Sequence, residues 1–178
     1  MERPDDDPLL VGLAAGDNRA FGVLYDRFGG RLYRVAMSML YRREDAEDAV
    51  QEVFVALVRS RHRLSAIRDL EAYLFAALRR AAARCAARRA RLPLISETAV
   101  EELAAPPCQN SESCLGDDLG RALRTLPMEQ RDVIALKIGG ALTFAQIGQV
   151  MGTSGNTAAS RYRYALEKLR ELLNDECR

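Results

Sequence analysis

The chain has no tryptophan, one histidine and only 6% aromatic residues among its 178 positions. It also lacks an apolar run near the roughly 18 residues that a membrane-crossing helix needs. Its start, MERPDDDPLL, is acidic and has neither the basic nor the apolar region of a signal peptide. Runs of alternating β-branched residues are missing too, which argues against a sheet. We therefore expect a cytoplasmic, helical protein with no membrane insertion.

Residue types that build catalytic and metal sites are scarce. His62 is the only histidine and cannot complete a metal site or a triad alone. Cys108 and Cys114 lie six positions apart without a nearby histidine, a weak metal motif, and Cys177 stands alone near the end. Cys85 lies among alanines and is expected to be a small buried apolar residue. With no phosphate-cradling glycine loop either, we expect no catalytic residue and no cofactor.

What the chain does have is 48% hydrophobic residues, many of them alanine, which favours packed helices. We predict an all-α protein: two small helical domains joined by a flexible acidic linker, the C-terminal one a helix-turn-helix. Residues 1–16 form a tail and a short helix, and residues 17–92 form the first domain. Residues 93–118, with several prolines and a polar tract, form the linker. Residues 119–178 form the second domain.

Helical periodicity predicts four helices in the first domain. They cover residues 17–28, 31–41, 44–60 and 69–91. Asp17 and Asp69 are the expected N-caps of the first and the last. We expect Gly29 and Gly30 to break the chain between the first two helices, and residues 61–68 to form a loop.

The second domain carries the clearest local pattern. Pro127 begins a helix that is expected to reach residue 138. Thr143 and Gln146 form a capping box for the next helix, and a turn follows over residues 152–155. Ser154 is the expected N-cap of the last helix. A short helix, a tight turn and a longer helix with a polar leading edge are typical of a helix-turn-helix.

The last helix is amphipathic, with apolar residues on one side. The opposite side carries residues suited to DNA, because Asn and Arg can contact base edges and Ser, Thr and Tyr can hold phosphates. That polar face comprises Asn156, Thr157, Ser160, Arg163 and Tyr164. Arg161 lies at its border and is placed to reach a phosphate. The alternative is an ordinary solvated helix, but the capped helix and turn before it favour DNA reading.

Charge is strongly segregated although the net charge is only +1. Residues 61–92 carry nine basic and two acidic side chains, whereas residues 93–120 carry six acidic and no basic ones. Almost all the cations are arginine, which binds phosphate in a planar, bidentate manner. The basic segment predicts contact with a polyanion, and hence salt-sensitive binding.

The third expected helix has an acidic face. Asp45, Asp48 and Glu52 recur at spacings of three and four, where like charges repel. Compensation of the helix dipole explains the early acids but not Glu52. We favour a face that meets a basic protein partner.

Three stretches of sequence resemble a known family: DAEDAVQEVFVALV, EAYLFAALRRAAARCAARRAR, and the segment from ALRTLPMEQ to YALEKLREL. In order and spacing they are similar to bacterial RNA polymerase sigma factors of the two-domain extracytoplasmic-function (ECF) group of the sigma-70 family. The resemblance covers about residues 17–92 and 119–173. It implies an all-helical protein that binds core RNA polymerase and promoter DNA, directs promoter-specific transcription initiation, and is regulated by an anti-sigma factor.

The resemblance also implies roles for individual residues. Core-polymerase binding falls on Asp45, Asp48, Gln51, Glu52 and Phe54. Binding of the minus-ten DNA falls on Arg61, His62, Arg63, Tyr73, Arg79, Arg80 and Arg84. Binding of the minus-thirty-five DNA falls on Ser154, Asn156, Thr157, Ser160, Arg161, Arg163 and Tyr164.

Some positions depart from the family pattern. The family usually has Trp at Tyr73, Asn at Arg80 and an acidic residue at Arg84, and a basic residue is common at Ala159. We expect these changes to alter promoter preference. Alanine is usual at Gly148, so this glycine is expected to cost up to about 1 kcal/mol of helix stability.

The residues leave two other classes of function to weigh, a DNA-binding regulator and an enzyme. A regulator could use the helix-turn-helix as a dimer on a palindromic operator, without polymerase. An enzyme would need an acid/base pair, a phosphate loop or a metal cluster, and the sequence offers none of these.

Overall fold

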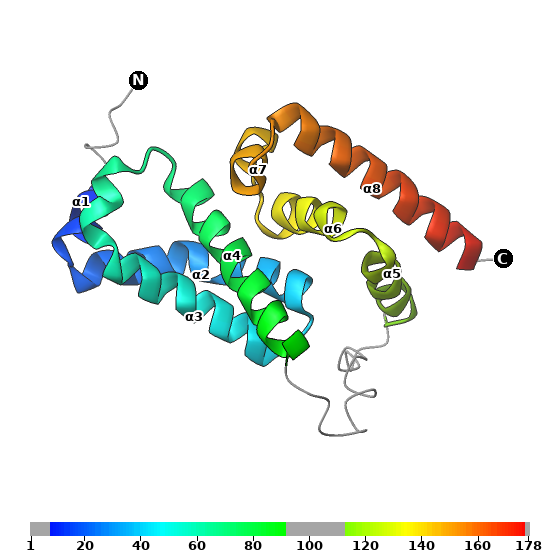
Figure 1. Cartoon of the computed structure of the whole chain (residues 1–178), viewed down its shortest axis with the longest axis horizontal. Helices are drawn as coiled ribbons and strands as arrows, with labels where there is room; N and C mark the ends of the chain where they lie inside the picture. Colours follow the sequence, from blue (N-terminus) through cyan, green and yellow to red (C-terminus); the bar gives the residue numbers. More distant parts are fainter. Residues whose placement is uncertain (1–7, 92–112, 177–178) are drawn as a thin grey trace. The chain divides into compact units, whose positions relative to one another are not determined.

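The computed structural model describes residues 8–91 and 113–176. Within these two ranges every regular element is a helix, and no strand occurs. The chain divides into two compact units, with the division between Ala87 and Arg88 (Figure 1). The all-α prediction is confirmed. Of the linker predicted over residues 93–118, positions 93–112 lie outside the described residues, as do Cys108 and Cys177, and the remaining positions belong to a helix that begins at Ser113.

The first unit contains the four α-helices and one short 3-10 helix of the N-terminal half. They are α1 (Pro8–Ala15), α2 (Asn18–Leu40), α3 (Arg43–Arg59), the 3-10 helix η2 (Arg61–Ala66) and α4 (Leu70–Arg91). Helix α2 packs along α3, and α1 contacts both α2 and η2. The core is formed mainly by apolar side chains of α2, α3 and α4, including Leu24, Phe28, Leu32, Val53, Leu57, Leu74, Phe75 and Leu78.

Helix α2 is continuous, so the predicted break at Gly29–Gly30 is wrong. Glycine in a helix costs about 1 kcal/mol relative to alanine, which lowers stability without forcing a stop. Here the apolar stripe of Leu24, Phe28 and Leu32 runs straight through the pair and is buried. Packing of that stripe on the core outweighs the local preference.

Both predicted N-caps of the first unit are confirmed. The Oδ1 atom of Asp17 accepts a hydrogen bond from the backbone N–H of Arg19 at 2.9 Å. The Oδ1 atom of Asp69 accepts one from the backbone N–H of Ala72 at 2.8 Å. Between them, the segment predicted as a loop over residues 61–68 instead begins with the 3-10 helix η2, which carries Leu64 into the core.

The second unit contains the helices of the C-terminal half. They are α5 (Ser113–Thr125), α6 (Met128–Ile134), the π-helical turn η4 (Ala135–Gly139), α7 (Phe144–Met151) and α8 (Gly155–Glu176). Helix α5 begins five residues before the expected start near residue 118. Pro127 precedes α6 as predicted, although the helix ends in a π-turn. One buried cluster joins α5, α6 and α8 through Ala122, Leu126, Ile134, Ala165 and Leu169.

Candidate protein and nucleic-acid interfaces

The helix-turn-helix is fixed by hydrogen bonds at both helix starts. The backbone N–H of Gln146 donates to Thr143 Oγ1 at 3.2 Å, and Gln146 Oε1 accepts from the Thr143 N–H at 3.0 Å. The capping box is therefore confirmed. Helix α7 ends at Met151, and its C-cap Gly152 has a φ of +68°. Ser154 Oγ accepts from the Thr157 N–H at 3.0 Å, so Ser154 caps α8 as predicted.

The turn between α7 and α8 is tight because of Gly148. A Cβ atom at this buried position would lie 2.8 Å from both the Gly155 nitrogen and the Thr153 carbonyl oxygen. These are backbone atoms of the turn and of the start of α8, so they cannot move aside cheaply. The expectation that Gly148 weakens the unit relative to alanine is wrong, because only glycine fits this approach.

Helix α8 has the two faces that the sequence predicts. Ala158 and Ala165 are fully buried against the rest of the unit. On the other side Asn156, Thr157 and Arg163 are exposed, and the Tyr164 side chain is 64% exposed. These outward groups are donors and acceptors on the first two and a half turns of one helix, next to its positive dipole end. The arrangement suits a polyanionic groove.

Arginines of the predicted DNA-binding set also make contacts within the protein. Arg161 is half-buried, and its Nη2 atom lies 2.9 Å from Glu129 Oε2 of α6. Arg163 Nη2 donates to the Oγ atom of the half-buried Ser160 at 3.3 Å. The first contact joins α8 to α6, and the second orients Arg163 along the polar face.

Sequence reasoning missed Lys137 of the π-turn. Its Nζ atom donates to the Leu142 carbonyl oxygen at 3.0 Å and lies 4.8 Å from the centroid of the Phe144 ring. The Phe144 ring in turn packs on Tyr162 of α8, with centroids 5.6 Å apart. Lys137 thus holds the segment that leads into α7. The one clue in the sequence was that this position carries lysine in a chain whose cations are almost all arginine.

In the first unit, the residues predicted to bind polymerase lie on α3 with intermediate or high exposure. Asp48 and Gln51 are exposed, whereas Asp45, Glu52 and Phe54 are half-buried. Beside them, Glu47 Oε1 accepts a hydrogen bond from Arg43 Nε at 2.8 Å. That hydrogen bond, and then the negative charge of Glu47, raises the pKa of Arg43 above its usual value.

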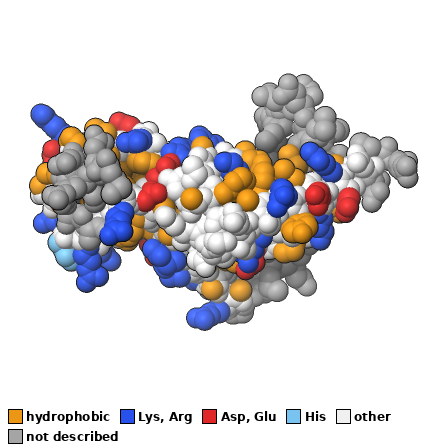
Figure 2. Space-filling model, turned by 90° about the horizontal axis from the view of Figure 1, so that it is seen from above, with side chains coloured by type: hydrophobic (Ala, Val, Ile, Leu, Met, Phe, Trp, Pro, Cys, Tyr) orange, Lys and Arg blue, Asp and Glu red, His pale blue; other side chains and the backbone are white. Residues whose placement is uncertain are grey.

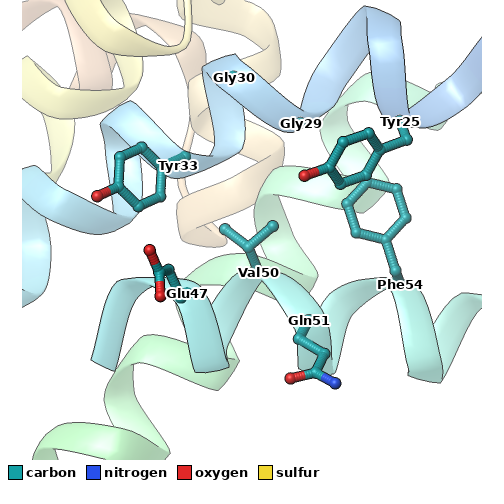
Figure 3. A pocket seen from close by; sticks show the side chains of 8 residues that line it. All are labelled: Tyr25, Gly29, Gly30, Tyr33, Glu47, Val50, Gln51 and Phe54. Atoms are coloured by element: carbon teal, nitrogen blue, oxygen red, sulfur yellow. The ribbon is translucent and has the colours of Figure 1, made fainter. Parts of the chain in front are cut away.

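A groove runs between α2 and α3, and two of the residues predicted to bind polymerase, Gln51 and Phe54, line it (Figure 3). It encloses about 580 Å³ and is mostly apolar. Figure 3 shows the rings of Tyr25 and Phe54 close together at one end, and Tyr33 with Glu47 toward the other. The ring centroids of Tyr25 and Phe54 are 5.3 Å apart. The remaining walls are Gly29, Gly30, Val50 and Gln51.

The glycine pair explains why the groove exists. Gly29 is packed against the ring of its own helical neighbour Tyr25, and Gly30 is exposed. With no side chain at either position, the surface of α2 is hollow where it faces Val50 of α3. The clue in the sequence was that apolar residues recur at helical spacing on both sides of the Gly-Gly pair. Such a pattern indicates a continuous helix with a hollow on its surface.

An ion pair connects the two predicted surfaces of the first unit. Arg84 of α4 donates from Nε and Nη2 to the same oxygen of Glu52 on α3, at 3.0 and 2.5 Å. Glu52, which the helix dipole leaves unexplained, therefore has a basic partner within the chain. The same contact places Arg84, predicted to bind DNA, next to the acidic face.

The other residues predicted for minus-ten DNA are spread over η2 and α4. His62, Arg63 and Arg80 are exposed, and Arg79 is half-buried. Tyr73 is half-buried, with its hydroxyl 3.4 Å from Ser60 Oγ.

Arg61 is exposed but packs on the end of α1, so closely that a Cβ at Gly16 would meet its Nη1 at 2.6 Å.

Figure 2 shows Lys and Arg side chains scattered over the visible face, with hydrophobic side chains exposed among them.

No helix in residues 8–91 or 113–176 is long and apolar enough to cross a membrane. In the same part of the chain, no three His, Cys, Asp or Glu side chains are grouped so that they could hold a metal ion. Cys85 is buried, as predicted for a small apolar residue.

Comparison with known proteins agrees with the two-unit arrangement. The Sigma-70 region 2 family matches residues 24–92, and the Sigma-70 region 4 family matches residues 122–171. The ECF RNA polymerase sigma factor SigK of Mycobacterium ulcerans is 31% identical, over 97% of this chain and 96% of that protein. The chain belongs to the ECF RNA polymerase sigma factors. SigM of Mycobacterium tuberculosis is also 31% identical, over 97% of this chain and 86% of that protein.

Two solved structures share the fold. CnrH, solved in complex with the cytosolic domain of CnrY, has a TM-score of 0.67 and 25% identity, covering 94% of this chain and 96% of that chain. The sigma factor RpoE of Bartonella quintana, solved with the anti-sigma factor NepR, has a TM-score of 0.66 and 24% identity, covering 88% and 98%. Membership of this family disfavours the alternative of an operator-binding dimer that acts without polymerase.

Proposed function

We propose that this ECF sigma factor acts in the cytoplasm by binding core RNA polymerase and directing it to specific promoters, with no chemistry of its own. The observation that carries the proposal is the succession of two family matches, region 2 and then region 4, on two separate compact units. One unit offers an acidic, grooved protein-binding face, and the other offers a helix with an exposed polar face. A chain built this way can hold a large enzyme and a DNA site together.

The polymerase-binding face is assigned to α3. Asp45, Asp48 and Gln51 are exposed or half-buried on this helix, and Gln51 and Phe54 line the groove together with Glu47. Carboxylates at the edge of an apolar groove combine electrostatic steering with apolar anchoring, which is how specific protein interfaces form. The partner surface should be basic opposite Asp48.

Promoter binding is divided between the two units. Helix α8 enters the major groove of the minus-thirty-five element, with Asn156 and Arg163 facing base edges and Ser154 and Thr157 near phosphates. In the first unit, the exposed Arg80 and the η2 residues His62 and Arg63 hold the opened minus-ten strand. A base flipped from the duplex would be received near η2.

Regulation by a protein partner completes the proposal. RpoE and CnrH were each solved with a bound protein, and NepR is named an anti-sigma factor. We infer an anti-sigma factor for this chain as well. Such a partner would act by covering the surfaces that polymerase and promoter need.

The assignment of α3 can be tested with one charge reversal. Asp48→Lys should weaken binding of the full-length protein to core polymerase by about tenfold or more, because an exposed carboxylate becomes a like charge facing a basic partner. Adding Glu52→Lys should deepen the loss. The matched control is Asp26→Lys, the same change at an exposed position of α2 outside the groove. Wild-type binding by Asp48→Lys in a quantitative pull-down would refute the assignment.

A further inference from the structure

A second hollow lies next to the groove, toward the C-terminal end of α3, and encloses about 600 Å³. This volume falls within the range of small-molecule sites, about 300–1,000 Å³. The lining combines three aromatic rings, two guanidinium groups and one carboxamide, and no acidic residue is among the described residues that form it. These groups belong to Phe21, Tyr25, Phe54, Arg59, Arg61 and Asn18.

One wall of the second hollow is aromatic and partly open to solvent. The ring centroids of Tyr25 and Phe54 are 5.3 Å apart, and the Tyr25 side chain is 59% exposed (Figure 3). Phe21 lies one turn before Tyr25 on α2 and is half-buried. Nucleic-acid bases stack on side chains of this kind, because every base has a π-face. The wall therefore suits a flat heteroaromatic ring.

The two arginines of the second hollow have no carboxylate partner among the described residues. Arg59 and Arg61 are both exposed, and neither forms an ion pair in residues 8–91 or 113–176. By contrast, Arg31, Arg43 and Arg84 are each paired with a glutamate. Arginine binds phosphate in a planar, bidentate manner. Two uncompensated guanidinium groups in one hollow therefore favour a phosphorylated ligand.

Arg61 differs from its neighbours that are predicted to bind minus-ten DNA. Its guanidinium packs on Gly16, where a Cβ atom would lie 2.6 Å from Nη1. Gly16 has a φ of +80°, a conformation that favours glycine, and it lines the same hollow. The end of α1 thus holds Arg61 at the wall of the hollow, whereas His62 and Arg63 are not among the lining residues.

The aromatic wall and the arginines are separated by a short span of one helix. Arg59 follows Phe54 by five positions on α3, a rise of about 7.5 Å at 1.5 Å per residue. In a nucleotide, the ribose separates the base from the first phosphate by a similar span. Asn18 adds an exposed carboxamide that can bond to a base edge or a ribose hydroxyl.

We propose that the second hollow binds a free purine nucleoside triphosphate, with the base stacked on Tyr25 and Phe54 and the phosphates on Arg59 and Arg61. A purine offers the larger π-face of the two base classes, and the triphosphate supplies the negative charge that the lining residues lack. The inference goes beyond the proposed function, which needs no small ligand.

A bound nucleotide should also weaken polymerase binding. Tyr25 and Phe54 line both the second hollow and the groove, and Phe54 is among the residues predicted to bind polymerase. This consequence rests on the proposed function, whereas nucleotide binding itself does not.

The test measures binding of ATP to the full-length protein by isothermal titration calorimetry, without polymerase or DNA. We expect one ATP per chain, bound about tenfold more tightly than adenosine or inorganic triphosphate, because stacking and phosphate contacts both contribute. Arg59→Ala should weaken ATP binding about fivefold by removing a charged phosphate contact. Its control is Arg19→Ala, at an exposed arginine of α2 that does not line the hollow.

A second pair of variants tests the aromatic wall. Tyr25→Ser should weaken ATP binding about tenfold by removing base stacking. Its control is Tyr164→Ser, the same change at a tyrosine that is 64% exposed on α8. A fluorescent single-stranded oligonucleotide with the minus-ten sequence should bind Tyr25→Ser as tightly as it binds the wild-type protein.

Three results would overturn the proposal. The first is a folded wild-type protein that does not bind ATP. The second is equal affinity for ATP and inorganic triphosphate with no effect of Tyr25→Ser, which would make the hollow a plain anion site. The third is a Tyr25→Ser variant that loses the oligonucleotide together with ATP, which would assign the hollow to the promoter strand.

Titration with core polymerase separates this inference from the proposed function. If the wild-type protein binds polymerase but not ATP, the sigma-factor function stands and the nucleotide site is refuted. If it binds ATP but not polymerase, the site stands and the proposed function falls. If it binds both, ATP should lower the polymerase affinity of the wild-type protein more than that of Arg59→Ala, and an equal affinity with and without ATP would refute the competition.

Discussion

The groove of the first unit and the turn of the second use glycine in opposite ways. Gly29 and Gly30 lie within α2 and leave a hollow on the outer surface, where the exposed ring of Tyr25 packs against the half-buried ring of Phe54. Gly148 lies inside and brings the backbone of α7 against the start of α8. The Gly29–Gly30 pair leaves a hollow on the surface of the first unit, whereas Gly148 allows two backbone segments to come into close contact inside the second unit. A substitution that adds the same methyl group should therefore have different consequences in the two places.

The largest expected effect is the loss of stability of the second unit in the variant Gly148→Ala. Its new Cβ would lie 2.8 Å from two backbone atoms, and forced overpacking of this kind costs about 1–3 kcal/mol. Thermal unfolding of the second unit should shift down by several degrees, and minus-thirty-five binding should fall because α8 is displaced.

The matched control is Gly120→Ala in α5, where a Cβ would meet nothing within 4 Å. It should stabilise the same unit by up to about 1 kcal/mol, because alanine is the better helix former. If both variants unfold at the same temperature, the close approach of α7 and α8 is not what holds the reading helix.

A smaller effect is expected from the outer face of α8. Arg163→Ala and Asn156→Ala should each weaken binding to the minus-thirty-five element by about 1–3 kcal/mol, the range for a lost base contact. Affinity for core polymerase should not change. Arg170→Ala, at an exposed position two turns further along α8, serves as the control.

If Arg163→Ala and Arg170→Ala lose the same affinity for specific and for non-specific DNA, this face of α8 binds phosphates only and does not read bases. Fluorescence anisotropy with promoter duplexes of matched length distinguishes the two results. A loss confined to the specific duplex is the expected result.

The smallest effect belongs to the ion pair that links α3 and α4. Glu52 and Arg84 are both substantially exposed, with 43% and 58% of their side chains accessible. Exposed pairs contribute about 0–1 kcal/mol, so a double-mutant cycle with Glu52→Gln and Arg84→Gln should give a coupling energy in that range. The coupling should shrink as salt is raised from 0.05 to about 0.5 M, because the charges are screened. A coupling above 2 kcal/mol would mean that the pair is a structural element of the unit.

Local patterns explain which elements the sequence could predict. The capping box of Thr143 and Gln146, the Ser154 cap and the continuous stripe of α3 depend on neighbours within one or two turns, and all are confirmed. The glycine positions depend on what lies across space. Gly148 can be understood only from the turn that folds back on it.

The same limit applies to the candidate interfaces. The sequence places Glu52 on an acidic face and Arg84 on a basic helix, but they lie 32 positions apart and only the fold brings them together. The groove likewise forms only where α2 and α3 lie side by side. Composition and period could identify the charged helices α3 and α4 but not the hollow between α2 and α3.

The central claim is that one chain joins core polymerase to chosen promoters through two separate surfaces. Sequencing the 5′ ends of transcripts made on genomic DNA by core polymerase, with and without this protein, tests it most directly. The account predicts a limited set of new start sites preceded by two shared elements. Those sites should be lost with Asp48→Lys and weakened with Arg163→Ala. The same start sites in the absence of the protein, or new sites that survive Asp48→Lys unchanged, would contradict it.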